Sequence, residues 1–342
     1  MYRVLRSLVA TLLLGLMLGA PLVQAVQAQD KSQIYMVVWR GCEEACQAFR
    51  DFFDERDLPV EVRVIDVDRN PDLLVGVRER ILAERPDMVV TWGTSVSVGL
   101  LGTRAEHGLR TALGNIPALF MIVADPVRSD LVESYERSGR AMVTGVQNRV
   151  PEATQMQLIR SYMDLSHVGV INNPMELNSQ INTDTLRTLG VEQKFQVTAV
   201  DYVLMPDGTP DVGQIPMLMD KLKAGGAEAV YVGSSSVNLA NRDAFTTAAV
   251  ARGLPVFTAY AQMVQDSQAL MAVANAYANV GRLAAAQAVK VLEQGITPGD
   301  LPIASLDRFS VFLNMEVARD LGLYPPIQLI NIAEIVGGQE RQ

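Results

Sequence analysis

The chain is poor in the residues that build metal centres and poor in positive charge. Only 2 His and 2 Cys occur among its 342 residues, so we expect no zinc site built from His and Cys ligands. Its 29 Lys and Arg face 38 Asp and Glu, for a formal net charge of −9. A nucleic-acid-binding protein would need a basic face, which this balance argues against.

Long apolar runs are also missing beyond the N-terminus. No later stretch approaches the roughly 18 apolar residues of a membrane-spanning helix. Yet 49% of the residues are hydrophobic, which excludes a largely disordered chain. The length suits two domains, each large enough to bury a core.

The N-terminus has the pattern of a secretory signal peptide. Residues 1–6 are basic, residues 8–23 are apolar, and small residues end two candidate cleavage sites at Ala25 and Ala28. A single membrane anchor is the alternative, but Pro21 and the two sites favour cleavage. We therefore expect residues 1–28 to be removed and the mature protein to be periplasmic, without a lipid anchor because the segment has no Cys.

Cys42 and Cys46 would then lie in an oxidising compartment. Their spacing places them across one helical turn, where Cα atoms are roughly 6 Å apart, near the upper end of the disulfide range. A local disulfide and two free thiols are both compatible with this spacing. A redox dithiol is less so, because the usual motif is C-x-x-C.

Short apolar runs alternate with amphipathic segments from residue 33 onward, which predicts parallel sheets covered by helices on both faces. Strands are expected at 34–38, 60–65, 88–91, 117–123, 143–146, 168–171, 196–202, 229–232, 256–258 and 309–313. Helices are expected at 43–56, 71–84, 95–106, 127–137, 152–163, 175–189, 212–224, 239–252 and 280–294, with a short one reaching residue 321.

The elements fall into two sets, with a break near residues 145–151. Residues 87–97 (DMVVTWGTSVS) and 228–238 (EAVYVGSSSVN) share an order of strand, Gly, hydroxyl cluster and helix. Each is followed by a strand that opens with Pro. This echo predicts two similar α/β lobes.

Ligands of open α/β sheets bind beyond the carboxyl ends of the strands. Trp39 and Arg40 follow the first strand, and Trp92 ends the third. In a sheet of order 2-1-3-4-5 these strands are neighbours, so both indoles of the chain lie at one rim. They either contact a ligand or pack in the core or hinge.

Hydroxyl residues open a helix in each lobe. Gly93, Thr94 and Ser95 can present free N–H groups to an anion or act as a plain helix cap. Ser234 and Ser235 would form the counterpart across a cleft.

Three more polar residues follow later strands. Asp125 can accept hydrogen bonds from a ligand amine, or can serve as a helix-start carboxylate before Pro126. Asn173 supplies both a donor and an acceptor. Tyr260 lies at another strand end, so all three are candidate ligand contacts.

Enzyme and cofactor motifs are not found. The chain has no Walker loop, no G-x-G-x-x-G, no H-E-x-x-H and no complete nucleophile elbow. Residues 66–72 imitate a calcium loop, but Pro71 and Val77 stand where Gly and Glu are needed. We expect a solvated turn there, no catalytic residues, no metal and no cofactor.

Several stretches together resemble a known family, the periplasmic substrate-binding proteins of ATP-driven importers, in the subgroup of tryptophan- and tyrosine-type binding proteins. The resemblance covers nearly all of the mature chain. The matching stretches are 116–126 (IPALFMIVADP), 143–146 (VTGV), 168–174 (VGVINNP), 281–295 and 309–314 (FSVFLN), with Ala318 and 321–323 (LGL).

The resemblance implies two Rossmann-like lobes joined by three crossovers, with a solute held between them. One lobe would comprise residues 29–147 plus about 276–305, and the other 148–275 plus about 306–342. The family's cleft positions map onto Gly93-Thr94-Ser95, Asp125 and Asn173. The chain departs from the family at residues 234–236 and at Ala276, where an acidic residue is common, which argues against a standard α-amino acid ligand.

The implied function is capture of a small solute, amino-acid-like or aromatic, by lobe closure and delivery to an ABC permease. We expect a monomer with no nucleic-acid partner. A sensory module of the same fold, presenting its ligand to a membrane receptor, is the main alternative. An exported enzyme is a weaker one, because no nucleophile or base is identifiable.

Overall fold

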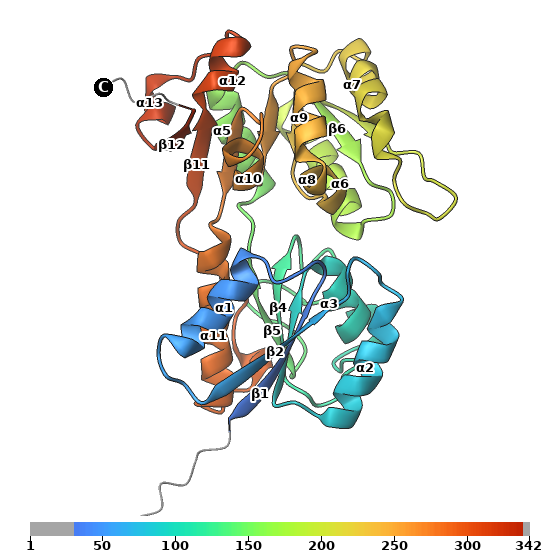
Figure 1. Cartoon of the computed structure of the whole chain (residues 1–342), viewed down its shortest axis with the longest axis vertical. Helices are drawn as coiled ribbons and strands as arrows, with labels where there is room; N and C mark the ends of the chain where they lie inside the picture. Colours follow the sequence, from blue (N-terminus) through green and yellow to red (C-terminus); the bar gives the residue numbers. More distant parts are fainter. Residues whose placement is uncertain (1–30, 338–342) are drawn as a thin grey trace, which may run out of the picture. The chain divides into compact units, whose positions relative to one another are not determined.

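The structure is a computed structural model that describes residues 31–337. The expected signal peptide lies outside these residues. Two sheets organise the described chain (Figure 1). We call each sheet with its covering helices a lobe.

The sheet of the first lobe has the order β2-β1-β3-β4-β5, and every pair in it is parallel. This is the order expected from the sequence, so β1 and β3 are direct neighbours. The elements are β1 (Ser32–Val38), α1 (Glu44–Asp54), β2 (Val60–Asp66), α2 (Leu73–Glu84), β3 (Met88–Trp92), α3 (Thr94–Leu101), α4 (Arg104–His107), β4 (Ala118–Val123) and β5 (Val143–Gln147).

The sheet of the second lobe has the order β12-β11-β10-β9-β8-β6-β7. Its first elements are α5 (Glu152–Tyr162), β6 (His167–Asn172), α6 (Leu177–Gln193), β7 (Gln196–Asp201), η1 (Val212–Gln214), α7 (Ile215–Ala224), β8 (Ala229–Val232), α8 (Ser236–Ala240), α9 (Arg242–Val250), β9 (Val256–Thr258), α10 (Ala261–Gln265) and β10 (Met271–Ala274). The chain continues through α11 (Tyr277–Leu292), η2 (Pro298–Asp300), β11 (Ser310–Asn314), α12 (Met315–Asp320), α13 (Ile327–Ile330) and β12 (Ala333–Val336).

The chain passes between the sheets three times. It leaves the first sheet after β5, returns after β10 to place α11 against α1, and enters the second sheet again before β11 (Figure 1). Because β11 starts at the end of the sheet where β10 stops, these two strands run antiparallel. The second sheet is therefore mixed, although parallel pairs dominate it.

α11 is part of the first lobe although it comes late in the sequence. Its buried residues Val280 and Ala284 share one apolar cluster with Phe49 of α1. Gly281 permits the contact, because a Cβ there would lie 2.1 Å from the carbonyl oxygen of Ala45. The segment after α11 stays with this lobe, where Ala304 bridges β5.

Three helices differ from the expectation. Residues 127–137 form turns, because the single turn after Pro126 stops at Asp130, whose φ is 54°. The helix expected at 95–106 breaks into α3 and α4 at Gly102, and the helix expected at 239–252 breaks into α8 and α9 at Asn241.

Candidate functional site

A cavity of about 650 Å³, open to solvent, lies where the strand ends of both sheets meet the crossing segments. The first lobe lines it with Trp39, Arg40, Trp92, Gly93, Thr94, Ser95, Ile122 and Ala124. The second lobe and the crossing segments line it with Asn148, Arg149, Val150, Asn178, Gly233, Ser234, Ser236, Ala259, Tyr260, Ala274, Asn275 and Tyr277.

Aromatic and cationic groups form the wall that follows β1 and β3. These strands pair in register, which brings Trp39 and Trp92 to the same rim. The guanidinium of Arg40 lies 5.2 Å from the ring centre of Trp92, a cation–π contact. Glu43 holds that guanidinium through contacts of 2.6 Å and 3.3 Å. Burial, the largest single influence, lowers the pKa of Arg40, but the hydrogen bond and charge of Glu43, together with Tyr260 and Tyr277, outweigh it and leave the pKa raised.

The helix α3 points its N-terminus at the cavity. Gly93 precedes it with φ 92° and ψ 156°, a conformation that only Gly adopts readily, and no side chain caps the helix. The first N–H groups of α3 are therefore free of a side-chain acceptor.

A bulge in β4 shapes another part of the cavity wall. The register between β4 and β5 shifts between Phe120 and Val123. Ile122, within the bulge, has a φ of 57°, which is strained for a β-branched residue. The bulge redirects this side chain into the cavity wall, a common use of such irregularities beside binding sites.

The first crossing segment contributes a buried arginine. Arg149 pairs with Glu152 at 3.0 Å, and its side chain is only 7% exposed. Nη2 also lies 3.5 Å from the hydroxyl of Tyr231, while Nε has no hydrogen-bond partner. Burial, the largest single influence, lowers the pKa of Arg149, but the charge of Glu152 and the nearby tyrosines Tyr231, Tyr260 and Tyr277 together outweigh it and leave the pKa raised.

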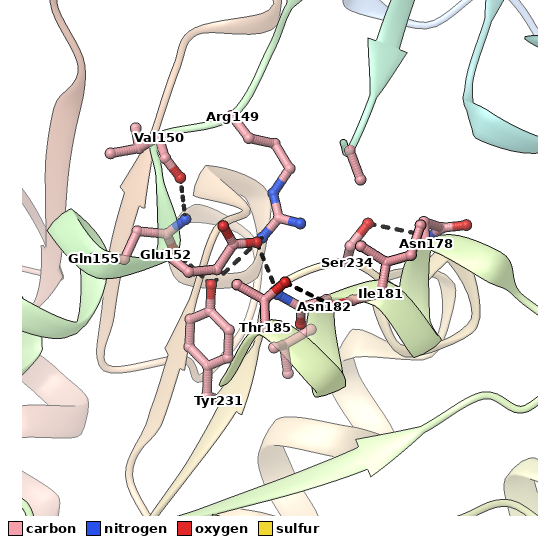
Figure 2. A network of polar contacts seen from close by, with 12 residues as sticks. Arg149, Val150, Glu152, Gln155, Asn178, Ile181, Asn182, Thr185, Tyr231 and Ser234 are labelled. Carbon is pink, nitrogen blue, oxygen red and sulfur yellow. Dashed lines mark hydrogen bonds and ion pairs between the residues drawn. The ribbon is translucent and has the colours of Figure 1, made fainter. Parts of the chain in front are cut away.

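A network behind Arg149 fixes its position (Figure 2). Glu152 accepts a hydrogen bond from Nδ2 of Asn182 at 3.0 Å. The hydroxyl of Tyr231 donates to Gln155 at 2.9 Å, and Gln155 in turn donates to the carbonyl of Val150 at 2.6 Å. The guanidinium is thus held from α5 and β8, and through Glu152 from α6, while Arg149 itself lines the cavity.

The second lobe presents hydroxyl and amide groups. Ser234 accepts a hydrogen bond from Nδ2 of Asn178 at 3.1 Å (Figure 2). The hydroxyl of Tyr260 accepts one from the backbone N–H of Ser235 at 3.0 Å. The N-terminus of α8 is already filled, because the N–H of Ser236 donates to both carboxylate oxygens of Glu176 at 3.1 Å and 3.0 Å.

Most residues singled out from the sequence lie at this cavity, and three do not line it. The carboxylate of Asp125 accepts the backbone N–H groups of Val127 and Arg128 at 3.1 Å and 2.9 Å. Asn173 is buried, and its side chain accepts the N–H of Met175. Ser235 caps α8 and donates to Glu176. The lining positions are Trp39, Arg40, Trp92, Gly93, Thr94, Ser95, Ser234 and Tyr260.

Sequence reasoning missed Arg149 and its neighbours in the crossing segments. In the sequence, residues 145–151 mark only the break between the two sets of elements, which predicts no ligand contact there. A charged residue flanked by Val146 and Val150 was the signal that could have found it, since such a charge must be held by a partner or face a cavity. Asn275 and Tyr277 lie at the second crossing in the same way.

A disulfide joins Cys42 and Cys46, with Cα atoms 5.2 Å apart, and closes the turn that leads into α1. Residues 66–72 form a polar turn in which Asp66 accepts backbone N–H groups from Gly41 and Asp68. Within residues 31–337 we find no group of three or more His, Cys, Asp or Glu arranged to hold a metal ion. None of the helices described there has the length and apolar character to cross a membrane.

Comparison with known proteins identifies the family. Residues 50–336 match the ABC transporter substrate binding protein family. A curated relative, the tyrosine-binding protein of Clostridioides difficile strain R20291, is 24% identical over 224 residues, which are 65% of this chain and 62% of the relative. The match thus spans less than two thirds of that protein.

Solved structures show the same fold. A conserved domain protein from Vibrio cholerae superposes with a TM-score of 0.76 at 19% identity, covering 90% of this chain and 100% of that one. An ABC domain in complex with L-Trp from Streptococcus pneumoniae gives 0.73 at 18% identity, covering 89% and 99%. The matched family is one of transporter substrate-binding proteins, which favours transport over a sensory role. The chain therefore belongs to the family of ABC transporter substrate-binding proteins.

Proposed function

We propose that the protein captures a small organic solute in this cavity outside the cytoplasm and delivers it to an ABC permease. One observation carries the proposal: a single cavity is lined by both lobes, by the crossing segments and by both Trp of the chain. A solute there contacts both lobes only when they are closed, so binding shifts the population toward the closed form.

The hinge follows from the chain path. The first lobe comprises residues 29–147 and about 276–305, and the second comprises 148–275 and about 306–342. The packing of α11 on α1 and the bridge from Val146 to Ala304 support this division. The first crossing contacts the other two, because Nδ2 of Asn275 donates to the carbonyl of Asn148 at 3.2 Å and the N–H of Gln147 donates to the carbonyl of Ala304 at 2.7 Å. Each crossing can absorb a small change in backbone angles.

The closed form has a latch outside the cavity. Arg128, in the loop after β4 of the first lobe, donates to the carbonyl of Ile181 at 3.1 Å and to the hydroxyl of Thr185. Both acceptors belong to α6 of the second lobe. Such hydrogen bonds form only when the lobes approach, so they add to the stability of the closed state.

The solute contacts are assigned to the cavity wall. Trp39, Trp92, Tyr260 and Tyr277 offer aromatic faces to a planar group. Gly93, Thr94, Ser95 and Ser234 offer polar contacts, with Arg40 and Arg149 as the charged groups. Asp125, Asn173 and Ser235 act behind the wall, because backbone and side-chain groups of the protein already use their polar atoms. The names of the relatives, which mention tyrosine and L-Trp, agree with an aromatic solute.

The protein reaches its site of action by export and works as a monomer. The signal peptide is cleaved after Ala25 or Ala28, and the mature chain meets a permease of the cytoplasmic membrane. Its family typically works outside the cytoplasm, which supports this placement.

Intrinsic fluorescence and solution scattering test the proposal together. We expect a solute from a broad metabolite panel to change Trp emission and to reduce the radius of gyration. Trp39→Phe and Trp92→Phe should each remove part of the emission change but leave the compaction in place. If no solute alters either signal, the proposed function is wrong.

A further inference from the structure

The charges that face the cavity have one sign. The described residues that line it include Arg40 and Arg149 and no Asp, Glu, Lys or His. Both guanidiniums lie where the aromatic rings gather. A bound solute therefore meets two cations and no carboxylate in direct contact.

Each guanidinium keeps donors for a ligand. Glu43 holds Arg40 from one side, and Glu152 holds Arg149 through Nη2. Nε of Arg149 is buried without a partner. An N–H left unpaired in a closed site is costly, so an acceptor atom that reaches this group would complete the site.

Other donor groups near the cavity also lack a side-chain acceptor among the described residues. Nε1 of Trp92, whose side chain is 3% exposed, has no hydrogen-bond partner. The N-terminus of α3, with its free N–H groups and positive end of the helix dipole, faces the same space. The amide of Asn148 also has an unpaired oxygen, so one donor on the solute can be accommodated.

The carboxylates that could hold an ammonium group are all engaged. Glu43 and Glu152 pair with the two arginines. Glu176 accepts from Ser236 and Ser235, and Asp125 accepts from the backbone of its own loop. Desolvating an ammonium without such a partner is costly.

One acidic residue lies beyond the cavity. Glu44 lines an adjoining cavity of about 450 Å³, which shares Tyr260, Asn275 and Tyr277 with the first. Glu44 is exposed and belongs to the far side of this aromatic pair. Glu44 lines only this adjoining cavity and not the one that Arg149 lines.

Taking the proposed function as given, we infer that the solute is a planar or aromatic carboxylate that carries no ammonium group. Its carboxylate binds Arg149 and the N-terminus of α3, and its ring packs among Trp39, Trp92 and Tyr260. This separates the chain from relatives whose names mention an amino acid.

A matched ligand series tests the inference by isothermal titration calorimetry. The probes are 3-(indol-3-yl)propionate, L-tryptophan and tryptamine, with the phenyl series 3-phenylpropionate, L-phenylalanine and phenethylamine as a second set. We expect the acids to bind at least about tenfold more tightly than the amino acids, the equivalent of about 1.4 kcal/mol. The amines should not bind.

Variants assign the effect to the guanidinium. Arg149→Gln should weaken binding of the acids by about tenfold or more, and Arg40→Gln provides a second variant if the first does not fold. Arg187→Gln, on the exposed face of α6 and paired only with Asp184, is the matched control and should bind as the unaltered protein does.

The outcomes distinguish this inference from the proposed function. If an amino acid or an amine binds as tightly as its acid, or if no carboxylate of either series binds at about 1 mM, the inference is wrong. Compaction by any other solute would still support capture and delivery. Absence of compaction with every solute would contradict the proposed function itself.

Discussion

Two turns of similar sequence face the same cavity and differ in what fills them. In the first lobe, Gly93 leads into α3, whose N-terminus has no side-chain cap. In the second lobe, Gly233 leads into α8, whose N-terminus is occupied by the carboxylate of Glu176. A repeated motif thus leaves one helix start without a side-chain cap and fills the other with one of the protein's own carboxylates.

The difference has a structural cause in the element that packs nearby. Glu176 is the residue before α6, and its carboxylate reaches both Ser235 and Ser236. Among the described residues, none that lines the cavity at the start of α3 is acidic. The sequence motif therefore specifies a helix start, while the neighbouring loop decides whether that start is available to a solute.

The largest loss of stability is expected when the carboxylate of Glu176 is removed from the start of α8. Glu176→Ala leaves the N–H of Ser236 and the hydroxyl of Ser235 without their acceptor, and should lower the free energy of unfolding by about 3 kcal/mol. Urea denaturation measures the change. Glu79→Ala, an exposed acidic residue of α2, is the control and should change it by less than about 0.5 kcal/mol. Equal losses in both variants would contradict the role given to Glu176.

The second largest loss of stability is expected from Gly93→Ala, which disturbs the uncapped start of α3. A Cβ at φ 92° and ψ 156° is strained, so we expect a loss of about 2 kcal/mol in unfolding free energy and weaker solute binding. Gly76→Ala provides the control, because Gly76 lies inside α2 with nothing within 4 Å of the added Cβ. There the helix propensity of Ala should raise stability by up to about 1 kcal/mol. A stabilised Gly93→Ala protein would show that the conformation is not required.

A smaller change is expected from the latch between the lobes. Arg128→Ala removes the hydrogen bonds to Ile181 and Thr185, which should favour the open form by about 1 kcal/mol and weaken apparent affinity about fivefold. Calorimetry with scattering measures both quantities. Arg187→Ala, which removes an arginine that lies on α6 and pairs with Asp184 of the same helix, should leave the affinity and the open–closed balance unchanged.

The smallest effect is the pH dependence of the filled helix start. Burial raises the pKa of Glu176, although hydrogen bonds from Ser236 and Ser235 oppose the shift. A carboxyl group whose folded pKa is above its unfolded value binds more protons in the folded state. Its contribution to stability is complete below the unfolded pKa of about 4.3 and falls as pH rises through the folded pKa.

A comparison with Glu176→Gln isolates the pH-dependent contribution of Glu176 to stability. The unfolding free energy of the unaltered protein, minus that of the variant, should decrease as the pH rises from 4 toward neutrality. Urea denaturation at a series of pH values measures it. A difference that increases over this range would indicate that the pKa is lowered instead.

Periodicity was sufficient to predict the strands of the first sheet, while their order came from the class of open α/β sheet and not from any local pattern. The strands β1, β3 and β4 are continuous apolar runs between helices, and such runs are typical of buried parallel strands. β10 was missed because its residues, MAVA, include two Ala, which has no strand preference. β12 was missed because it is short and partly exposed.

The candidate site was predictable only where it follows strands. Trp39, Trp92 and Ser234 were found because strand ends converge in this class of fold. The pairing of Arg149 with Glu152, and of Glu176 with Ser236, depends on loops whose paths no local pattern specifies. The antiparallel β11 likewise follows from the route of the chain through the other lobe.

The packing of α11 on α1 also sets an order of completion during synthesis and export. The face of α1 that carries Phe49 stays uncovered until Val280 and Ala284 have emerged, and β5 gains its bridge only with Ala304. The lobe whose strands are made first is therefore finished late, after most of the other lobe has been made. Until then it exposes apolar surface that a chaperone would have to shield.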